Sequence, residues 1–277
     1  MGRVARRSLP LDPRRERPGA ELTVLVEDRR AGEQLATFAA HLPADHGAGL
    51  PEMHAPVDMG VHLAEQQMAA FDSTMASIPP RGWVLTLNQH LPDDVAVRAA
   101  RAVPTGFTPR FQSKKKRYRY DLLLDKVRDP LLSRRTWRIG YDMDMARLER
   151  ESKAIVGTHD FVAFRSAGDE RTDTVRTIHN VSVTRAPMMS TEQESTSTVS
   201  LYSITIEGSA FLYNMVRILV GTLVDVARGH LEEGAIARAL AEKDRSFAGQ
   251  TAPAHGLTLQ AIELELPTEG VGERWPR

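Results

Sequence analysis

The sequence predicts a mixed α+β protein whose strands pair largely in antiparallel fashion. Strand-like and helix-like segments occur in both halves of the chain, and they do not follow the strict strand–helix–strand alternation of a parallel sheet. No convincing internal repeat relates the two halves. With 277 residues and 42% hydrophobic content, the chain is long enough for one large or two modest domains with ordinary buried cores.

Composition excludes several classes of site. The chain has no cysteine, which rules out disulfides, thiolate zinc sites and a catalytic thiol. No apolar run approaches the roughly 20 residues of a membrane helix, and no apolar core follows the arginine-rich N-terminus as it would in a secretory signal. We therefore expect a soluble cytoplasmic protein without a membrane partner.

The N-terminal half is expected to begin after a flexible arm. Residues 1–20 are rich in arginine and proline and lack hydrophobic periodicity. Residues 21–113 are assigned to the first α+β half. Its expected elements are strands at 21–26, 68–71 and 95–103, and a helix at 32–42 with its apolar residues on one face.

Residues 114–277 are assigned to the second α+β half. It should open with a strand at 116–124, where Tyr118 and Tyr120 alternate with Arg119 and Asp121. The apolar helix at 211–227 is expected to be capped by Ser209. The other expected elements are helices at 143–156 and 231–241 and strands at 177–184, 199–206 and 257–266.

Charge is balanced overall but clustered locally. Lys+Arg and Asp+Glu both number 36, yet Lys114–Tyr120 interleaves cations with aromatic rings on one strand. Such a strand can meet RNA phosphates while its rings stack on bases. A solvated strand end with both tyrosines packed in the core explains the same residues equally well.

Arg217 lies in a helix that is apolar over most of its circumference. A guanidinium there is costly unless it is paired, and its natural partner is a carboxylate, whose ionised form it would favour. A structural ion pair, or an arginine that extends out of the helix to solvent, is the alternative.

Asp58 lies in a turn-like segment, Ala55–His62, where Gly60 permits a sharp bend beside the carboxylate. An isolated aspartate beside a glycine is usually a turn residue, and His62 is more typical of a packed or capping histidine than of a general base. No spacing of His, Asp and Glu indicates a metal site, and no phosphate loop or nucleophile elbow indicates a small-molecule enzyme.

Taken together, several segments between about Asn88 and Leu266 resemble the TruA-type tRNA pseudouridine synthases, in collinear order. They are Leu91–Val97, Arg110–Phe111, Lys116–Tyr120, His159–Arg165, Arg176 with Val181–Arg185, Ala210–Gly221, Ala241–Arg245 and His255–Leu259. The family's Gly-Arg-Thr-Asp-Ala-Gly-Val-His motif is matched in register by Ala55–His62, with Pro56 and Val57 in place of its arginine and threonine.

The resemblance implies an isomerase that turns uridine into pseudouridine without cofactor or metal, on the 3′ side of the tRNA anticodon stem-loop. It implies two ferredoxin-like halves around a basic cleft, in a homodimer. Asp58, Tyr118 and Arg217 would be catalytic. RNA contacts would come from Arg110, Lys114, Lys115, Lys116, Arg117, Arg165 and Arg176. The alternative is a catalytically impaired tRNA-binding protein or RNA chaperone, since the Pro56-Val57 substitution changes the loop that presents Asp58.

Overall fold

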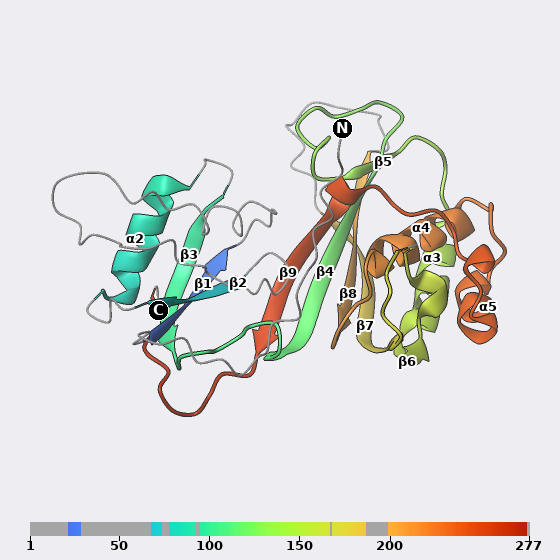
Figure 1. The fold of residues 1–277 in the computed structure, drawn as a ribbon. Helices are drawn as coiled ribbons and strands as arrows, with labels where there is room; N and C mark the ends of the chain where they lie inside the picture. The colour runs from blue at the N-terminus through green and yellow to red at the C-terminus, as the bar shows by residue number, and fades with distance from the viewer. Residues whose placement is uncertain are drawn as a thin grey trace, which may run out of the picture. The chain divides into compact units, whose positions relative to one another are not determined.

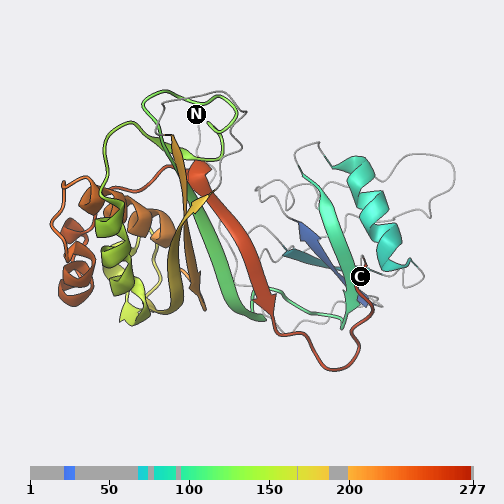
Figure 2. The ribbon, with the colours of Figure 1, turned by 180° about the vertical axis from the view of Figure 1, so that it is seen from behind.

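The computed structural model describes residues 22–28, 68–73, 78–91, 95–166, 168–186 and 199–275. The chain divides into two compact units, Met1–Gln112 with Leu266–Arg277, and Ser113–Glu265. Each unit combines an antiparallel or mainly antiparallel sheet with helix, as Figures 1 and 2 show. The predicted α+β class is therefore confirmed.

The described part of the first unit consists of a three-stranded antiparallel sheet and one helix. Strand β1 (Leu22–Asp28) lies between β2 (Met68–Ser73) and β3 (Val97–Val103). Helix α2 (Pro80–His90) packs on this sheet through Trp83, Val84 and Leu87. Helix α2 is not among the predicted elements, because its apolar stripe consists of only these few residues. The expected helix at 32–42 lies outside the described residues.

The C-terminal segment belongs to the first unit. The backbone groups of Trp275 and Ala100 exchange hydrogen bonds of 2.9 and 3.0 Å, and the Gly272 amide donates to the Ala102 carbonyl at 2.9 Å. Trp275 also packs against the core beneath α2. The residues after Glu265, which the sequence assigned to the second half at 114–277, therefore belong to the first unit.

The second unit is a six-stranded sheet with β4 (Ser113–Leu124) as its most extensively paired strand. One edge of β4 pairs with β8 (Ser200–Gly208), which continues to β7 (Val175–Ala186) and β6 (Gly157–Asp160). The other edge pairs antiparallel with β9 (Leu257–Leu264) and, at its end, in parallel with β5 (Trp137–Ile139). Strands β5 and β6 are not among the predicted elements, because they are too short to show a hydrophobic period.

Helices α3 (Met145–Ser152), α4 (Met215–Ala227) and α5 (Ala235–Glu242) cover one face of this sheet (Figures 1 and 2). Helix α4 lies in the core, where Leu219 and Leu223 are fully buried with Tyr120 and Ile204 of the sheet. None of the described helices is long and apolar enough to cross a membrane.

The expected cap of this helix at Ser209 is wrong. Helix α4 begins at Met215, and the residue before it, Asn214, has φ 59° and ψ 4°. Asparagine tolerates this left-handed conformation better than other residues with a side chain. The turn through Asn214 therefore separates Phe211 and Leu212, which are buried as expected, from the helix proper.

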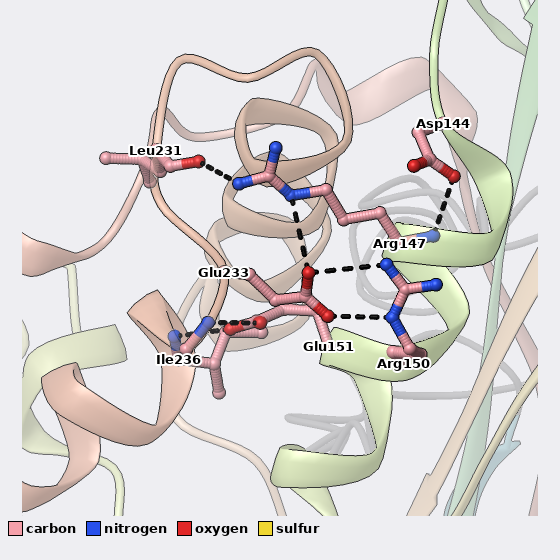
Figure 3. A network of polar contacts seen from close by, with 8 residues as sticks. Asp144, Arg147, Arg150, Glu151, Leu231, Glu233 and Ile236 are labelled. Atoms are coloured by element: carbon pink, nitrogen blue, oxygen red, sulfur yellow. Dashed lines mark hydrogen bonds and ion pairs between the residues drawn. The ribbon is translucent and has the colours of Figure 1, made fainter.

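A buried carboxylate joins α3 to the start of α5 (Figure 3). Both oxygens of Glu151 accept backbone N–H bonds, from Gly234 and from Ile236, at 2.7 Å each. Around it, Glu233 pairs with Arg150 at 2.8 Å and with Arg147 at 4.0 Å. A side chain distant in sequence thus satisfies amides that the first turn of a helix leaves without partners.

Candidate active site

The guanidinium of Arg217 is held by neutral acceptors. Its Nε donates to the Ala252 carbonyl at 2.7 Å, and one of its terminal nitrogens donates to Asn214 Oδ1 at 2.8 Å. The backbone carbonyl of Arg217 in turn accepts from the Ala252 amide at 3.0 Å. Among the described residues, no carboxylate pairs with this half-buried cation.

The turn that precedes α4 orients Arg217. Asn214 contacts Arg217 through its side-chain oxygen, and its amide nitrogen donates to Ser166 Oγ at 3.3 Å. The neighbouring Tyr213 amide donates to Asp169 at 3.1 Å, and Arg171 bonds both Asp169 and the Phe211 carbonyl. The segment after β6 therefore fixes the turn from which Arg217 is positioned.

Tyr118 lies on the helix-covered side of β4, the side that it shares with Tyr120 as the alternation predicted. Its ring meets Phe211 edge to face, with ring centroids 5.0 Å apart, and it packs at the margin of the core rather than within it. Edge-to-face contacts of this kind fix the plane of a ring. The position of the Tyr118 ring is thus set by the same segment that leads into α4.

Tyr120, on the same side of the strand, is deeper. It is fully buried, and its hydroxyl donates to the Pro253 carbonyl at 2.6 Å. Burial raises the pKa of this phenol, and the nearby positive charge of Arg217 opposes the rise only partly. Tyr120 and Arg217 therefore hold adjacent carbonyls of the 252–253 segment, and Tyr120 remains a neutral donor.

Two glycines permit this close packing. A Cβ on Gly221 would lie 1.8 Å from the Gln250 carbonyl oxygen, and one on Gly256 would lie 2.6 Å from the Tyr120 ring. The segment beside Gly221 is also fixed by Thr222 and Asp225, which accept the Gly249 and Gln250 amides at 2.9 and 3.0 Å. The absence of side chains lets the 249–253 segment reach Arg217 and Tyr120.

Asp58 lies outside the described residues, as do Pro56, Val57 and His62. Its pairing with Arg217 remains a prediction. Within the ranges that the structure describes, no group of His, Asp and Glu side chains is arranged to hold a metal ion.

Most cations of the basic run on β4 are paired with carboxylates on, or just after, the neighbouring strands. Lys114 lies 2.5 Å from Glu265, Lys115 lies 3.1 Å from Glu207, and Arg117 contacts Glu207 at 2.6 Å. Arg117, and then Lys115, hold the pKa of Glu207 below its usual value. Lys116 is half-buried. Much of the positive charge that the sequence displays here is neutralised across the sheet.

The other predicted RNA contacts are scattered. Arg110 is exposed in the turn before β4. Arg165 donates to the Arg171 carbonyl at 2.7 Å, beside the loop that holds Asn214. Arg176 lies 3.4 Å from Asp173 and is largely buried. Of these three, Arg165 is the one that the structure connects to the surroundings of Arg217.

Sequence reasoning missed Asn214 and the 252–253 carbonyls. Nothing in the residue types shows that Asn214 adopts a left-handed conformation, although an asparagine just before an apolar helix is a signal for a special turn. The carbonyls carry no sequence signal at all, since every residue has one.

Comparison with known proteins covers the part of the chain that contains Arg217. The tRNA pseudouridine synthase family profile matches residues 152–263, which include Arg217, Asn214 and Ala252. A tRNA pseudouridine synthase A of Bacillus licheniformis is 42% identical over 205 residues, covering 74% of this chain and 77% of the relative.

Two further relatives bear the same name. The protein of Bacillus subtilis is 39% identical over 73% of this chain and 76% of its own length. That of Thermoanaerobacter pseudethanolicus is 37% identical over 74% of this chain and 78% of its own. Identity at this level over this share of both chains shows common ancestry and a common fold, and the chain belongs to the tRNA pseudouridine synthase family.

Proposed function

We propose that this chain isomerises uridine to pseudouridine in tRNA. The observation that carries the proposal is the Arg217 guanidinium, held by neutral groups in a segment shared with the family and open to pairing with an anion. The reaction breaks the N1–C1′ bond and forms a C5–C1′ bond. The hydrogen on C5 is lost and one is gained on N1, so the reaction needs no oxidant and no added group.

Asp58 would supply the carboxylate, either as a nucleophile or as a proton acceptor at the sugar. Arg217 would keep that carboxylate ionised, because a neighbouring positive charge favours the charged form. Tyr118 would stack on the uracil after the nucleotide leaves its helix. The contact between Tyr118 and Phe211 supports this role, since it leaves the ring at the edge of the core.

The finer features of the family belong to the same proposal. The substrate would be the anticodon stem-loop, bound in a basic cleft between two ferredoxin-like halves, at about 21–113 and 114–265, of a cytoplasmic homodimer. Phosphates would be contacted by the residues named from the sequence, Arg110, Lys114, Lys115, Lys116, Arg117, Arg165 and Arg176. Arg165 is favoured by its place beside the turn that orients Arg217.

The test follows the hydrogen that the reaction removes. Because C5 of the target uridine loses its hydrogen, tRNA labelled with tritium at C5 should release tritium to water. Wild-type protein is expected to release it, and Asp58→Ala is expected to abolish release. The matched control is Asp142→Ala, which removes an exposed aspartate of the second unit.

Wild-type protein that binds tRNA but releases no tritium would overturn the proposal in favour of the non-catalytic RNA-binding alternative. Full activity of Asp58→Ala would support the reaction but show that Asp58 is not its catalytic carboxylate. Mapping the pseudouridine in the product tests the stem-loop assignment separately.

A further inference from the structure

The cations of the second unit differ in whether they have partners. Across its described residues, nearly every arginine and lysine contacts a carboxylate, a carbonyl, a hydroxyl or a ring. Those without such a contact are Lys126, Arg128, Arg134, Arg135 and Lys153, and all of them are exposed. All but Lys153 lie in one loop, residues 125–136, which connects β4 to β5.

The carboxylates of this loop serve the backbone. Asp125 Oδ1 accepts the Val127 amide at 2.9 Å, and Asp129 Oδ1 accepts the Leu131 amide at 2.8 Å. Both aspartates thus form local turns, and neither is paired with a described cation of the loop. The loop carries a net positive charge and leaves its guanidinium groups free to bind an external anion.

The loop is also ordered by its own contacts. Arg138 donates to the carbonyls of Asp125 and Lys126 at 3.2 Å each, and the buried Thr136 hydroxyl donates to the Leu132 carbonyl at 3.0 Å. A loop that is shaped in advance loses less conformational entropy when it binds a partner. On its outer side, Val127 and Leu131 are 69% and 87% exposed, beside the free cations.

The loop lies at some distance from the candidate active site along the same strand. Tyr118 and Leu124 are separated by about 20 Å at the usual rise of a β-strand. A ligand that reaches both Tyr118 and the loop must therefore be much larger than a nucleoside. An RNA backbone has both the length and the repeated negative charge that these arginines suit, since guanidinium groups bind phosphates in bidentate fashion.

We propose that the 125–136 loop is a second contact for the phosphate backbone of tRNA, remote from the reacting uridine. This inference rests on the proposed function, because it takes tRNA as the ligand. Arg128, Arg134 and Arg135 are the main contacts. Their role is to anchor the body of the substrate, and they take no part in the bond rearrangement.

The experiment compares tRNA binding by wild-type protein, R128A/R134A/R135A and R128K/R134K/R135K over a range of salt concentrations. If each arginine meets a phosphate, the alanine variant should reduce the slope of log Kd against log salt by about 0.7 to 0.9 per lost contact. The lysine variant should restore most of the slope. The single variants R134A and K153A form the matched pair, since both remove one exposed, unpaired cation.

Turnover distinguishes this inference from the proposed function. The alanine variant should raise KM for full-length tRNA about tenfold or more while kcat stays near wild type, and a short oligonucleotide around the target uridine should be bound equally by both proteins. The inference would be overturned if R134A and K153A had equal slopes of log Kd against log salt. It would also be overturned if the lysine variant did not restore the slope that the alanine variant loses. An unchanged slope with a changed oligomeric state would overturn it too and assign the loop to a contact between copies. Failure of wild-type protein to form pseudouridine would instead count against the proposed function.

Discussion

Arg217 illustrates how one charged residue is accommodated in an apolar helix. A backbone carbonyl and the Asn214 amide oxygen accept hydrogen bonds from its guanidinium, so this cation has polar partners. None of these partners is a described carboxylate. These acceptors hold the cation in place without cancelling its charge. Such an arrangement suits a group that must stabilise an anion brought by another part of the chain or by substrate.

Asn214→Gly should separate the backbone role of Asn214 from its side-chain role. Glycine accepts φ 59° without strain, so the turn should persist while the contact with Arg217 is lost. A hydrogen bond to a charged group is worth about 1.5–3 kcal/mol, so we expect kcat to fall by about tenfold or more. Steady-state kinetics with tRNA and the melting temperature check this.

In the same series, Asn214→Ala should lower the melting temperature more than Asn214→Gly, because alanine is strained at this φ. Unchanged kcat in the glycine variant would mean that Asn214 does not position Arg217.

Tyr118 should matter for turnover more than for binding. Tyr118→Ala removes the ring held by Phe211, and we expect kcat to fall by about a hundredfold or more, since base stacking contributes on the order of 1–3 kcal/mol and misplacement of the base adds to the loss. The Kd for tRNA should change little, because phosphate contacts dominate affinity. Tyr118→Phe keeps the ring and is the control for packing. Equal losses in Kd and kcat would argue against a stacking role.

At the scale of elements, contacts distant in sequence hold the helices to each other. Glu151 of α3 completes the first turn of α5, and the Arg150–Glu233 pair links α3 to the segment just before α5 (Figure 3). Because α5 is short, its stability depends on this external cap more than on its own propensity.

Glu151→Ala should therefore destabilise the second unit. The change leaves the Gly234 and Ile236 amides without their acceptors and opens space at a buried position, for a cost of about 2–4 kcal/mol. Urea denaturation measures the loss. Glu149→Ala, on the exposed side of the same helix, is the control and should change stability by less than about 0.5 kcal/mol. Equal effects of the two substitutions would contradict the capping role.

Gly221→Ala tests the contact between α4 and the segment that carries Ala252. The new methyl group would overlap the Gln250 carbonyl, and backbone cannot move aside as a flexible side chain can. We expect a loss of about 3 kcal/mol or more in stability, together with reduced turnover because the Ala252 carbonyl shifts away from Arg217. Thermal melts and tritium release report on the two effects. Wild-type stability and wild-type turnover would show that the segment carrying Ala252 can move away from α4 without affecting either.

At the scale of the whole molecule, stability should decline in acid. The Thr174 hydroxyl and then the Lys243 ammonium hold the pKa of Asp160 below its usual value, and Glu207 is similarly lowered by Arg117 and Lys115. A lowered native pKa stabilises the fold fully above the unfolded value of about 4, and this contribution is lost as pH falls through the native value. Urea midpoints should therefore be nearly constant from about pH 6 to 8 and drop below about pH 4.

Asp160→Asn should lower the urea midpoint near neutral pH and reduce the drop in acid, because the asparagine has no charge to titrate. Thr174 would keep one acceptor, but Lys243 would lose its ion pair. An acid drop as large in this variant as in wild type would show that other carboxylates control it.

The order of residues is enough to predict the α+β class, most strands and helices of the second unit, and the family. It also predicts that Tyr118 and Tyr120 share one side of β4. These follow from local periodicity and from short segments in fixed order, and both are properties of neighbouring residues. The helix at 32–42 and the Asp58–Arg217 pair stay predictions, since both involve residues outside the described ranges.

Which charges are neutralised cannot be predicted from the sequence, because it depends on the folded structure. Lys115 and Arg117 look like free cations in the sequence, yet strand register brings them to Glu207, about ninety residues away. Arg128, Arg134 and Arg135 also have acidic residues nearby in the sequence, namely Asp125 and Asp129. In the fold, however, these aspartates accept hydrogen bonds from backbone amides. An ion pair depends on distance in space, which register and turns set and which residue type does not reveal.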